Sequence, residues 1–186
     1  MILPIAAFGM PSLRKKSIEI SKNYDNLDIL ISNMFDTLYK SEGVGLAAPQ
    51  INKSIRLFIV DTNPFINNEE QSDFKPIKKV FINPIILDES GPEWSYNEGC
   101  LSIPNIREDI SRKEKISIQY QDENFITKTE DFTGINARVI QHEYDHIEGV
   151  LFIDRISALR KRMLKRKLND IVKGKVKVNY KMQFSK

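Results

Sequence analysis

The feature that most constrains the fold lies between Gln141 and Gly149, where the sequence reads QHEYDHIEG. This run contains both histidines of the 186-residue chain, His142 and His146, and Glu143 directly follows the first. Residues four positions apart on an α-helix lie one turn apart on the same face. The spacing therefore predicts a helix from about Gly134 to Ile147 that presents both imidazole rings to one point.

Apolar spacing in the rest of the chain predicts an α+β fold. Helical periodicity marks a first helix from about Asn26 to Tyr39 and a basic one from Ser157 to Gly174. We expect largely antiparallel sheets around the central helix that carries the histidines, flanked by an N-terminal helix and a basic C-terminal helix. The predicted strands are Ile55–Asp61, Lys79–Leu87 and a hairpin over Lys115–Asp131, with a short strand or extended segment at Val150–Asp154 and a surface excursion at Thr62–Lys79. The apolar side of the basic helix should consist of Leu159, Met163, Leu164, Leu168, Ile171 and Val172.

Length and composition indicate one domain that spans residues 1–186. The single cysteine, Cys100, excludes an internal disulfide and suits a reducing compartment. The chain has no apolar run near the ~18 residues of a membrane span and no convincing secretory signal at its start. We therefore expect a cytoplasmic protein with no membrane partner.

Charge is distributed unevenly along the chain. Residues 1–154 hold 16 Lys and Arg against 24 Asp and Glu, a net charge of −8, whereas residues 155–186 hold 12 Lys and Arg against one Asp, a net charge of +11. This basic extension from about residue 155 fits either a solvated helix face or a segment attracted to phosphate-rich surfaces.

The histidine pair fits a metal site, because both rings can direct a nitrogen at one ion. Glu143 lies beside that point, where a carboxylate can take a proton from a metal-bound water. The alternative is a surface helix with two solvated histidines. A catalytic metal site usually has three protein ligands and one open position, so the chain should contain a third ligand.

The third ligand does not follow the pattern of the common zinc peptidases. Phe152 stands where a third histidine would stand in the long-spacer pattern, and no glutamate follows Glu148. Asp154, Asp170 or an upstream residue remain as candidates. Upstream, Cys100 in NEGCLSIP is either a small buried apolar residue or a soft ligand on a glycine-flanked loop. A thiolate with two imidazoles would suit zinc or ferrous iron.

Three stretches together resemble the peptide deformylase family. They are GVGLAAPQ (Gly43–Gln50), EGCLS (Glu98–Ser102) and QHEYDH (Gln141–His146), in the family's order. The resemblance continues through ILPI, LRK, SIP, IRED and GVLFID, and it weakens around Thr62–Lys79 and at the C-terminal end. It implies an enzyme that removes the formyl group from the N-terminal formylmethionine of nascent polypeptides and releases formate.

The resemblance also implies roles for individual residues. Cys100, His142 and His146 match the metal ligands, and Glu143 matches the general acid/base. Gln50 and the backbone N–H of Leu101 match the donors to the carbonyl oxygen, where losing one donor typically costs about 2.7–4 kcal/mol. Gly45 matches a backbone contact to the substrate, and Arg107 matches a position near the mouth of the active site. Glu98 and Arg112 match a pair that holds the cysteine loop. The wall of the methionine pocket corresponds to Val44, Tyr96, Ile135 and Val139, with the stem of Arg138.

The resemblance further implies one divalent metal ion, with Fe2+ expected physiologically and Zn2+, Ni2+ or Co2+ able to replace it. It also suggests that the basic C-terminal segment contacts the ribosome. The residues that would carry this contact are Arg160, Lys161, Arg162, Lys165, Arg166 and Lys167.

Two other interpretations compete with deformylation. A zinc peptidase or general amidase would explain the histidine pair but leaves Cys100 and GVGLAAPQ without a role. A nonenzymatic, metal-dependent RNA-binding module would explain the basic tail, but it gives Glu143 no function.

Overall fold

The computed structural model describes residues 1–66 and 74–185, and most of its strands form one antiparallel sheet. In this sheet each strand pairs antiparallel with the next along the chain. A separate two-stranded sheet pairs β1 (Ile5–Ala6) with β7 (Met182–Gln183) in parallel. The strands of the large sheet, in order, are β2 (Gly45–Ala47), β3 (Leu57–Asp61), β4 (Lys78–Cys100), β5 (Ile103–Gln121) and β6 (Thr127–Thr133).

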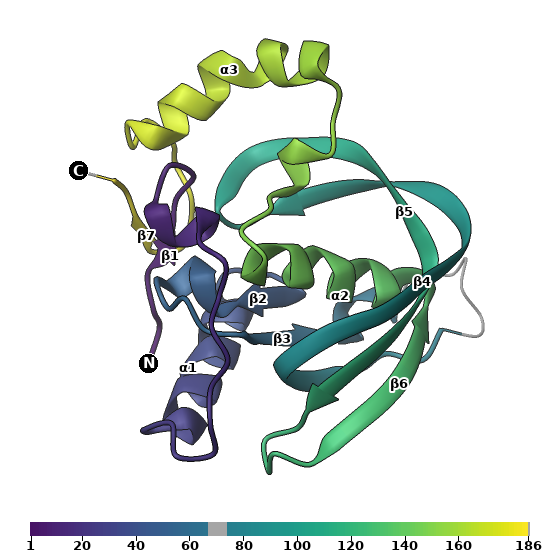
Figure 1. Ribbon diagram of the computed structural model, residues 1–186. Helices are drawn as coiled ribbons and strands as arrows, with labels where there is room; N and C mark the ends of the chain where they lie inside the picture. The colour runs from purple at the N-terminus through teal and green to yellow at the C-terminus, as the bar shows by residue number, and fades with distance from the viewer. Residues whose placement is uncertain (67–73, 186) are drawn as a thin grey trace.

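The long strands β4 and β5 curve around the helix α2 (Gly134–Ile147), which crosses the middle of the molecule (Figure 1). Their pairing shifts register at several points, among them between Ser90 and Glu93 and between Gly99 and Cys100. Such irregularities bend a strand and increase its local twist. The bent β4–β5 hairpin can therefore cover α2, and the turn between its two strands, next to Cys100, still lies close to the helix.

Helix α2 has the predicted bounds, and a glycine after it allows the chain to turn away. Gly149 has a positive φ of 76°, and a Cβ there would lie 2.8 Å from the backbone oxygen of Arg14. Only glycine fits this close approach without strain. The helix is buried on almost every side because its apolar residues form one core with the concave face of the sheet. That core contains Ile135, Ala137, Val139, Ile140 and Ile147 from α2, with Phe58, Val60, Phe81, Ile116, Ile118 and Phe132 from the strands.

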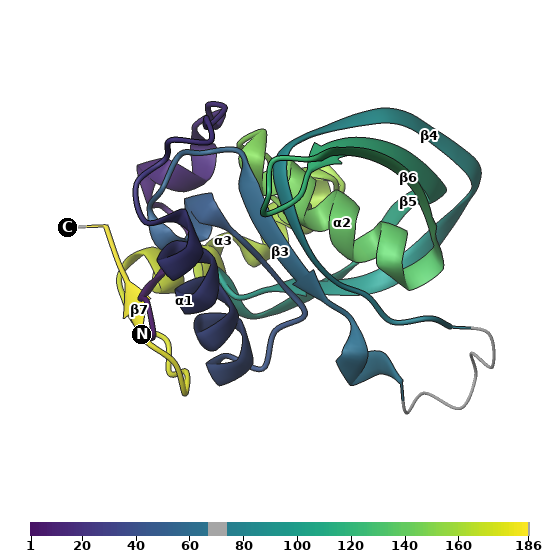
Figure 2. The same ribbon diagram turned by 90° about the horizontal axis from the view of Figure 1, so that it is seen from below.

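The first helix, α1 (Leu27–Lys40), packs on the other side of β2 and β3, as its apolar spacing predicts. Leu30, Met34 and Leu38 point into this second core. Figure 2 shows α1 and α2 on opposite sides of β3. The strand is therefore buried on both faces, which explains its continuous apolar sequence LFIV.

A third core lies beneath α3 (Ala158–Val172), the basic helix. Leu164, Leu168 and Ile171 are buried, but the predicted apolar side is only partly correct, because Leu159 and Met163 are 69% and 64% exposed. These two residues lie in the first turns of the helix, on a surface that the described residues do not cover. Beyond α3 the chain returns to pair with β1, so two strands near opposite ends of the chain lie side by side (Figure 1).

The α+β class with largely antiparallel strands is confirmed, and two local predictions are wrong. The segment Val150–Asp154 ends in a 3-10 helix, η4 (Phe152–Asp154), because the Asp154 carboxylate accepts the Leu151 N–H at 2.9 Å and closes a turn. Strand β4 extends to Cys100 rather than ending near Leu87, since exposed residues continue its ladder with β5. The remaining short 3-10 helices are η1 (Pro11–Arg14), η2 (Ala48–Ile51) and η3 (Asn63–Phe65).

The predicted surface excursion at Thr62–Lys79 begins with η3, and residues 67–73 of it lie outside the described part of the chain. None of the helices in the described ranges combines the length and the hydrophobicity that crossing a bilayer requires.

Candidate metal centre and active site

Three potential metal ligands from separate elements converge where the β4–β5 hairpin meets α2. The ligand atoms of Cys100, His142 and His146 all lie within 4.8 Å of one another, and Cys100 Sγ is 3.2 Å from His146 Nε2. Ligands around a tetrahedral ion with bonds of 2.0–2.3 Å are about 3.5 Å apart. The donor set and its spacing therefore fit a zinc or iron ion with one position left for water.

The two imidazole rings have different electrostatic surroundings. Burial disfavours both imidazolium ions, yet the neighbouring Cys100 and Glu98 raise the pKa of His142 to about 10. Burial and the adjacent His142 lower the pKa of His146 well below its usual value. Of the two rings, His142 is thus the one that lies beside the acidic partners.

Glu98 orients His142 from behind. Its Oε2 lies 2.9 Å from His142 Nδ1, so Nδ1–H donates to the carboxylate and Nε2 is left to face the cysteine. Arg112 donates to both Glu98 oxygens, at 2.7 and 3.0 Å, and Arg138 donates to one at 3.0 Å. Burial alone would raise the pKa of Glu98, but His142 and Arg112 hold it well below its usual range. Glu98 is therefore an anchored carboxylate that fixes the ring and its tautomer.

A further ion pair ties this network to α2. Arg112 donates to Asp145 at 2.7 Å, and Arg155 donates to the same carboxylate at 2.7 Å. Arg112 is almost fully buried, so its charge needs these partners. Its pKa is raised by Glu98 and Asp145 against the opposing effect of burial.

Glu143 is buried beside the cluster, and its Oε2 atom has no hydrogen-bond partner among the described residues. Burial raises its pKa to about 7. Gly45 of β2 packs directly on this side chain, because a Cβ at position 45 would lie 2.4 Å from Glu143 Oε1. The carboxyl group is thus held in a narrow space with a pKa suited to taking and returning a proton near neutral pH.

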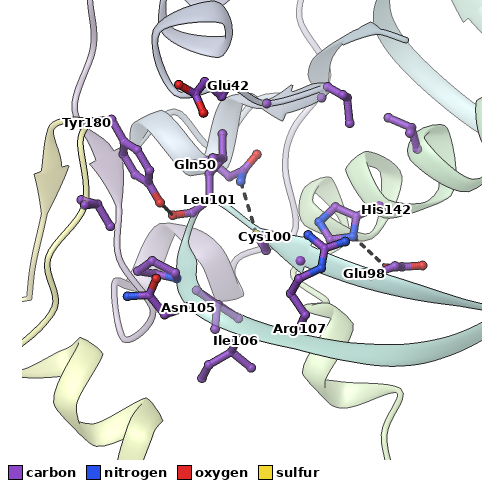
Figure 3. Close-up of a pocket in the computed structure, with 18 of the residues that line it drawn as sticks. Glu42, Gln50, Glu98, Cys100, Leu101, Asn105, Ile106, Arg107, His142 and Tyr180 are labelled. Atoms are coloured by element: carbon purple, nitrogen blue, oxygen red, sulfur yellow. Dashed lines mark hydrogen bonds and ion pairs between the residues drawn. The ribbon is translucent and has the colours of Figure 1, made fainter. Parts of the chain in front are cut away.

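Cys100, His142 and Glu143 line a cavity of about 680 Å³. Gln50 enters from η2: its Oε1 accepts the Ala47 N–H at 2.8 Å, and its Nε2 lies 3.5 Å from Cys100 Sγ. Figure 3 shows this amide directed at Cys100. Because the carbonyl end of the amide is occupied, the N–H end faces the cavity.

Comparisons with known proteins bear on this arrangement. The family model described as polypeptide deformylase matches residues 2–162. The chain belongs to the peptide deformylase family. Curated peptide deformylases from Christiangramia forsetii and Flavobacterium johnsoniae are each 53% identical to it, covering 99% and 100% of this chain and 96% and 97% of their own.

Solved structures agree with the sequence comparison. A peptide deformylase from Plasmodium falciparum is 36% identical, with a TM-score of 0.81 over 91% of this chain and 95% of its own. One from Legionella pneumophila is 34% identical, with a TM-score of 0.80 over 94% and 98%. The protein is therefore a metal-dependent hydrolase that removes the formyl group from nascent formylmethionyl peptides. This result favours deformylation over the peptidase and RNA-binding interpretations.

Most residues that the deformylase resemblance implied lie together in the structure. Val44, Gly45, Gln50, Tyr96, Glu98, Cys100, Leu101, Arg107, Arg138, Val139, His142 and Glu143 all line the cavity. Ile135 does not: it lies one helical turn before Val139, in the core between α2 and the sheet. Ile135 packs in the same cluster as Val44, Tyr96 and Val139, and its part in the pocket wall stays a prediction.

Other residues that line this deformylase cavity were not predicted from the sequence. They include Glu42, Phe65, Ile103, Pro104, Asn105 and Ile106, together with Lys177, Val178, Asn179 and Tyr180 from the C-terminal tail. The segment Ile103–Ile106 directly follows the cysteine motif, so its proximity could have been inferred. The tail carried no such signal, because the resemblance weakens there.

Proposed function

We propose that Cys100, His142 and His146 hold one divalent metal ion and that Glu143 is the general acid/base for deformylation. The observation that carries this proposal is the convergence of the three ligand atoms beside a buried carboxyl group whose pKa is near 7. When bound, the ion would lower the pKa of a coordinated water from about 15.7 toward about 7. Glu143 takes the proton of the attacking water and returns it to the amine nitrogen, which leaves poorly unless protonated.

Gln50 Nε2 and the Leu101 N–H donate to the formyl oxygen as charge develops on it. The geometry that supports this role is the fixed amide of Gln50 and the position of Leu101 directly after Cys100. The methionine side chain enters the apolar part of the cavity, lined by Val44, Tyr96 and Val139. Gly45 presents its backbone to the substrate from the same edge.

The decisive experiment measures formate release from formyl-Met-Ala-Ser beside its acetylated and unblocked analogues. The wild type should process only the formylated peptide. Glu143→Gln should keep its metal and lose about 10²–10⁴-fold in kcat. Cys100→Ser should lose metal as well as activity. An equal rate on the acetylated peptide would refute the specificity, and a fully active Glu143→Gln variant would refute the role of Glu143.

Ferrous iron is the physiological metal in this proposal. A thiolate with two imidazoles accepts both iron and zinc, so the ligand set does not choose between them. The family resemblance points to iron. Activity of the iron-loaded enzyme should fall in air and persist with nickel or cobalt. Equal stability in air for all these metals would count against iron.

The chain functions as one catalytic domain over residues 1–186, with the basic extension from about residue 155 packed on β5 through α3. It acts in the cytoplasm, where nascent chains emerge, and α3 contacts the ribosome. Arg160 and Lys161 pair with Glu108 and Asp154, so the available charge is on exposed residues. These are Arg162, Lys165, Arg166 and Lys167.

Reversing these four charges should abolish co-sedimentation with ribosomes, and wild-type binding should weaken steeply between about 50 and 200 mM salt. Reversal of Lys22 and Lys53, which are exposed outside α3, serves as the control. Unchanged binding by the α3 variant would exclude this surface.

A further inference from the structure

The C-terminal tail forms one side of the catalytic cavity. Residues Lys177 to Tyr180, between α3 and β7, line the cavity together with Cys100, His142 and Glu143. Figure 3 shows Tyr180 reaching across to Leu101.

The tail is held there by backbone pairing with the start of the chain. Ile5 N–H donates to Lys181 O at 2.9 Å, and Ala7 N–H donates to Gln183 O at 2.8 Å. Asn52 adds a side-chain bond to Gln183 at 2.8 Å. The β1–β7 sheet therefore fixes Tyr180 relative to the cavity.

Residues next to the β1–β7 sheet hold the turn that contains Leu101 through two hydrogen bonds. The Tyr180 hydroxyl donates to Leu101 O at 2.8 Å, and Phe8 N–H donates to Ser102 O at 2.8 Å. Phe8 follows β1 and Tyr180 precedes β7, so the two donor residues are next to the two paired strands of this sheet. Both carbonyl groups of the turn are thus held from outside the hairpin.

The turn depends on such outside contacts. Leu101 and Ser102 connect β4 to β5 directly, because Cys100 pairs with Ile103. Two-residue hairpin connections favour turns with positive φ at their first central residue. Neither Leu101 nor Ser102 has a positive φ, and the ladder shifts register between Gly99 and Cys100. The hairpin alone therefore does not determine where the Leu101 backbone points.

We propose that Tyr180 is a positioning residue for deformylation, which fixes the Leu101 backbone so that its N–H faces the formyl oxygen. The carbonyl that Tyr180 holds and the N–H that donates to substrate flank the same Cα atom, so restraining one limits the other. Burial raises the pKa of Tyr180 above its ordinary value, which keeps the hydroxyl protonated as a donor. The inference rests on the proposed role of the Leu101 N–H.

The test compares Tyr180→Phe with the wild type on formyl-Met-Ala and formyl-Met-Ala-Ser, with metal content measured in each preparation. Losing one oxyanion donor costs about 10²–10³-fold in kcat, so a donor that is only misplaced should cost about 10-fold. We expect this loss in kcat on both peptides, with KM changed less than about twofold and metal content unchanged.

Tyr39→Phe is the matched control. The Tyr39 hydroxyl donates to Asp61 at 2.7 Å, so this variant also loses one tyrosine hydrogen bond, but outside the cavity. It should retain the wild-type kcat. A Tyr180→Phe enzyme with normal kcat would overturn the proposal, as would a rise in KM alone that grows with peptide length, because the tail would then act only as a wall.

A second arm replaces the Cys100–Leu101 amide by an ester through incorporation of leucic acid at position 101, which removes the N–H. Low kcat in the ester variant, with no further loss on adding Tyr180→Phe, supports the proposal. Low kcat in the ester variant with normal kcat in Tyr180→Phe overturns the positioning role and leaves the donor role intact. Normal kcat in the ester variant overturns the donor role, and the positioning role with it.

Discussion

At the scale of single residues, the tightest constraint on the site is the contact between Gly45 and Glu143. An added Cβ at Gly45 would meet Oε1, Cδ and Cγ of Glu143 at 2.4 to 2.8 Å. Real Cβ atoms do not approach so closely, so the glutamate would have to move. Since Glu143 has a flexible side chain, the fold can absorb this shift, whereas proton transfer depends on hydrogen-bond reach.

Gly45→Ala should therefore lower kcat by about 10–100-fold with little change in melting temperature. Formate release and thermal unfolding measured on one preparation separate the two effects. In the Glu143→Gln background the added Gly45→Ala should cost almost nothing more, because both changes act through one carboxyl group. Fully additive losses would show that Gly45 acts independently of Glu143.

Residue types and spacing predicted His142, His146 and Glu143 as a group, because chemistry limits which residues ligate a metal. They left Cys100 as one of several candidates for the third ligand, and the resemblance to peptide deformylases selected it. The resemblance also implied Arg112 as a partner of Glu98, but the other partners of Glu98 were not predicted. Arg138 and His142 lie 40 and 44 residues from it in sequence, and only the folded hairpin brings them together. Tyr180 was missed for the same reason, since its contact with Leu101 spans 79 residues.

At the scale of elements, one carboxylate stabilises the segment that connects α2 to α3. Asp154 of η4 accepts from Arg14, from Lys161 at 2.7 Å and from the Leu151 N–H at 2.9 Å. Burial alone would raise the pKa of Asp154, but these partners lower it from 3.8 to about 2. The ionised group therefore stabilises the fold above its unfolded pKa, and this contribution is lost as pH falls toward the folded value.

Asp154→Asn should lower the free energy of unfolding by about 1 kcal/mol at pH 7, a modest value because Arg14 and Lys161 are partly exposed to solvent. The asparagine can still accept the Leu151 N–H, so the change isolates the charge. Urea unfolding at several pH values should show the difference from wild type constant above about pH 4 and shrinking between about pH 4 and 2. Asp131→Asn, at an exposed site on β6, is the control. A difference that persists at pH 2 would contradict the assignment.

Elements with a regular apolar period were predicted well, because burial of one face imposes that period. Helix α1 follows this rule. Strand β3 is buried on both faces and was instead predicted from its continuous apolar run, and α2 from the stripe that its apolar residues share with the two histidines. Residues 88–93 of β4 are exposed and show no alternation, so nothing local marks them as a strand. At η4 a side-chain cap, rather than the apolar pattern, determines the conformation.

At the scale of the whole molecule, the candidate ligands join two parts of the fold that are far apart in sequence. Cys100 is the last residue of β4, whereas both histidines belong to the central helix α2. Removing the metal should therefore affect global stability as well as turnover. Chelation should lower the melting temperature of the wild type and leave that of Cys100→Ser nearly unchanged, measured by calorimetry with and without a chelator.

An ion shared by Cys100 and His146 would tie together points 46 residues apart in sequence. Unlike a covalent bridge, which stays closed in the unfolded chain, an ion released on unfolding stabilises the fold by the free energy of its binding. Each tenfold excess of free metal over its dissociation constant would add about 1.4 kcal/mol, or about 4 °C in melting temperature for a chain of this size. A protein with a single cysteine, and hence no internal disulfide, would thus gain a removable link between distant segments from the ion that it needs for chemistry.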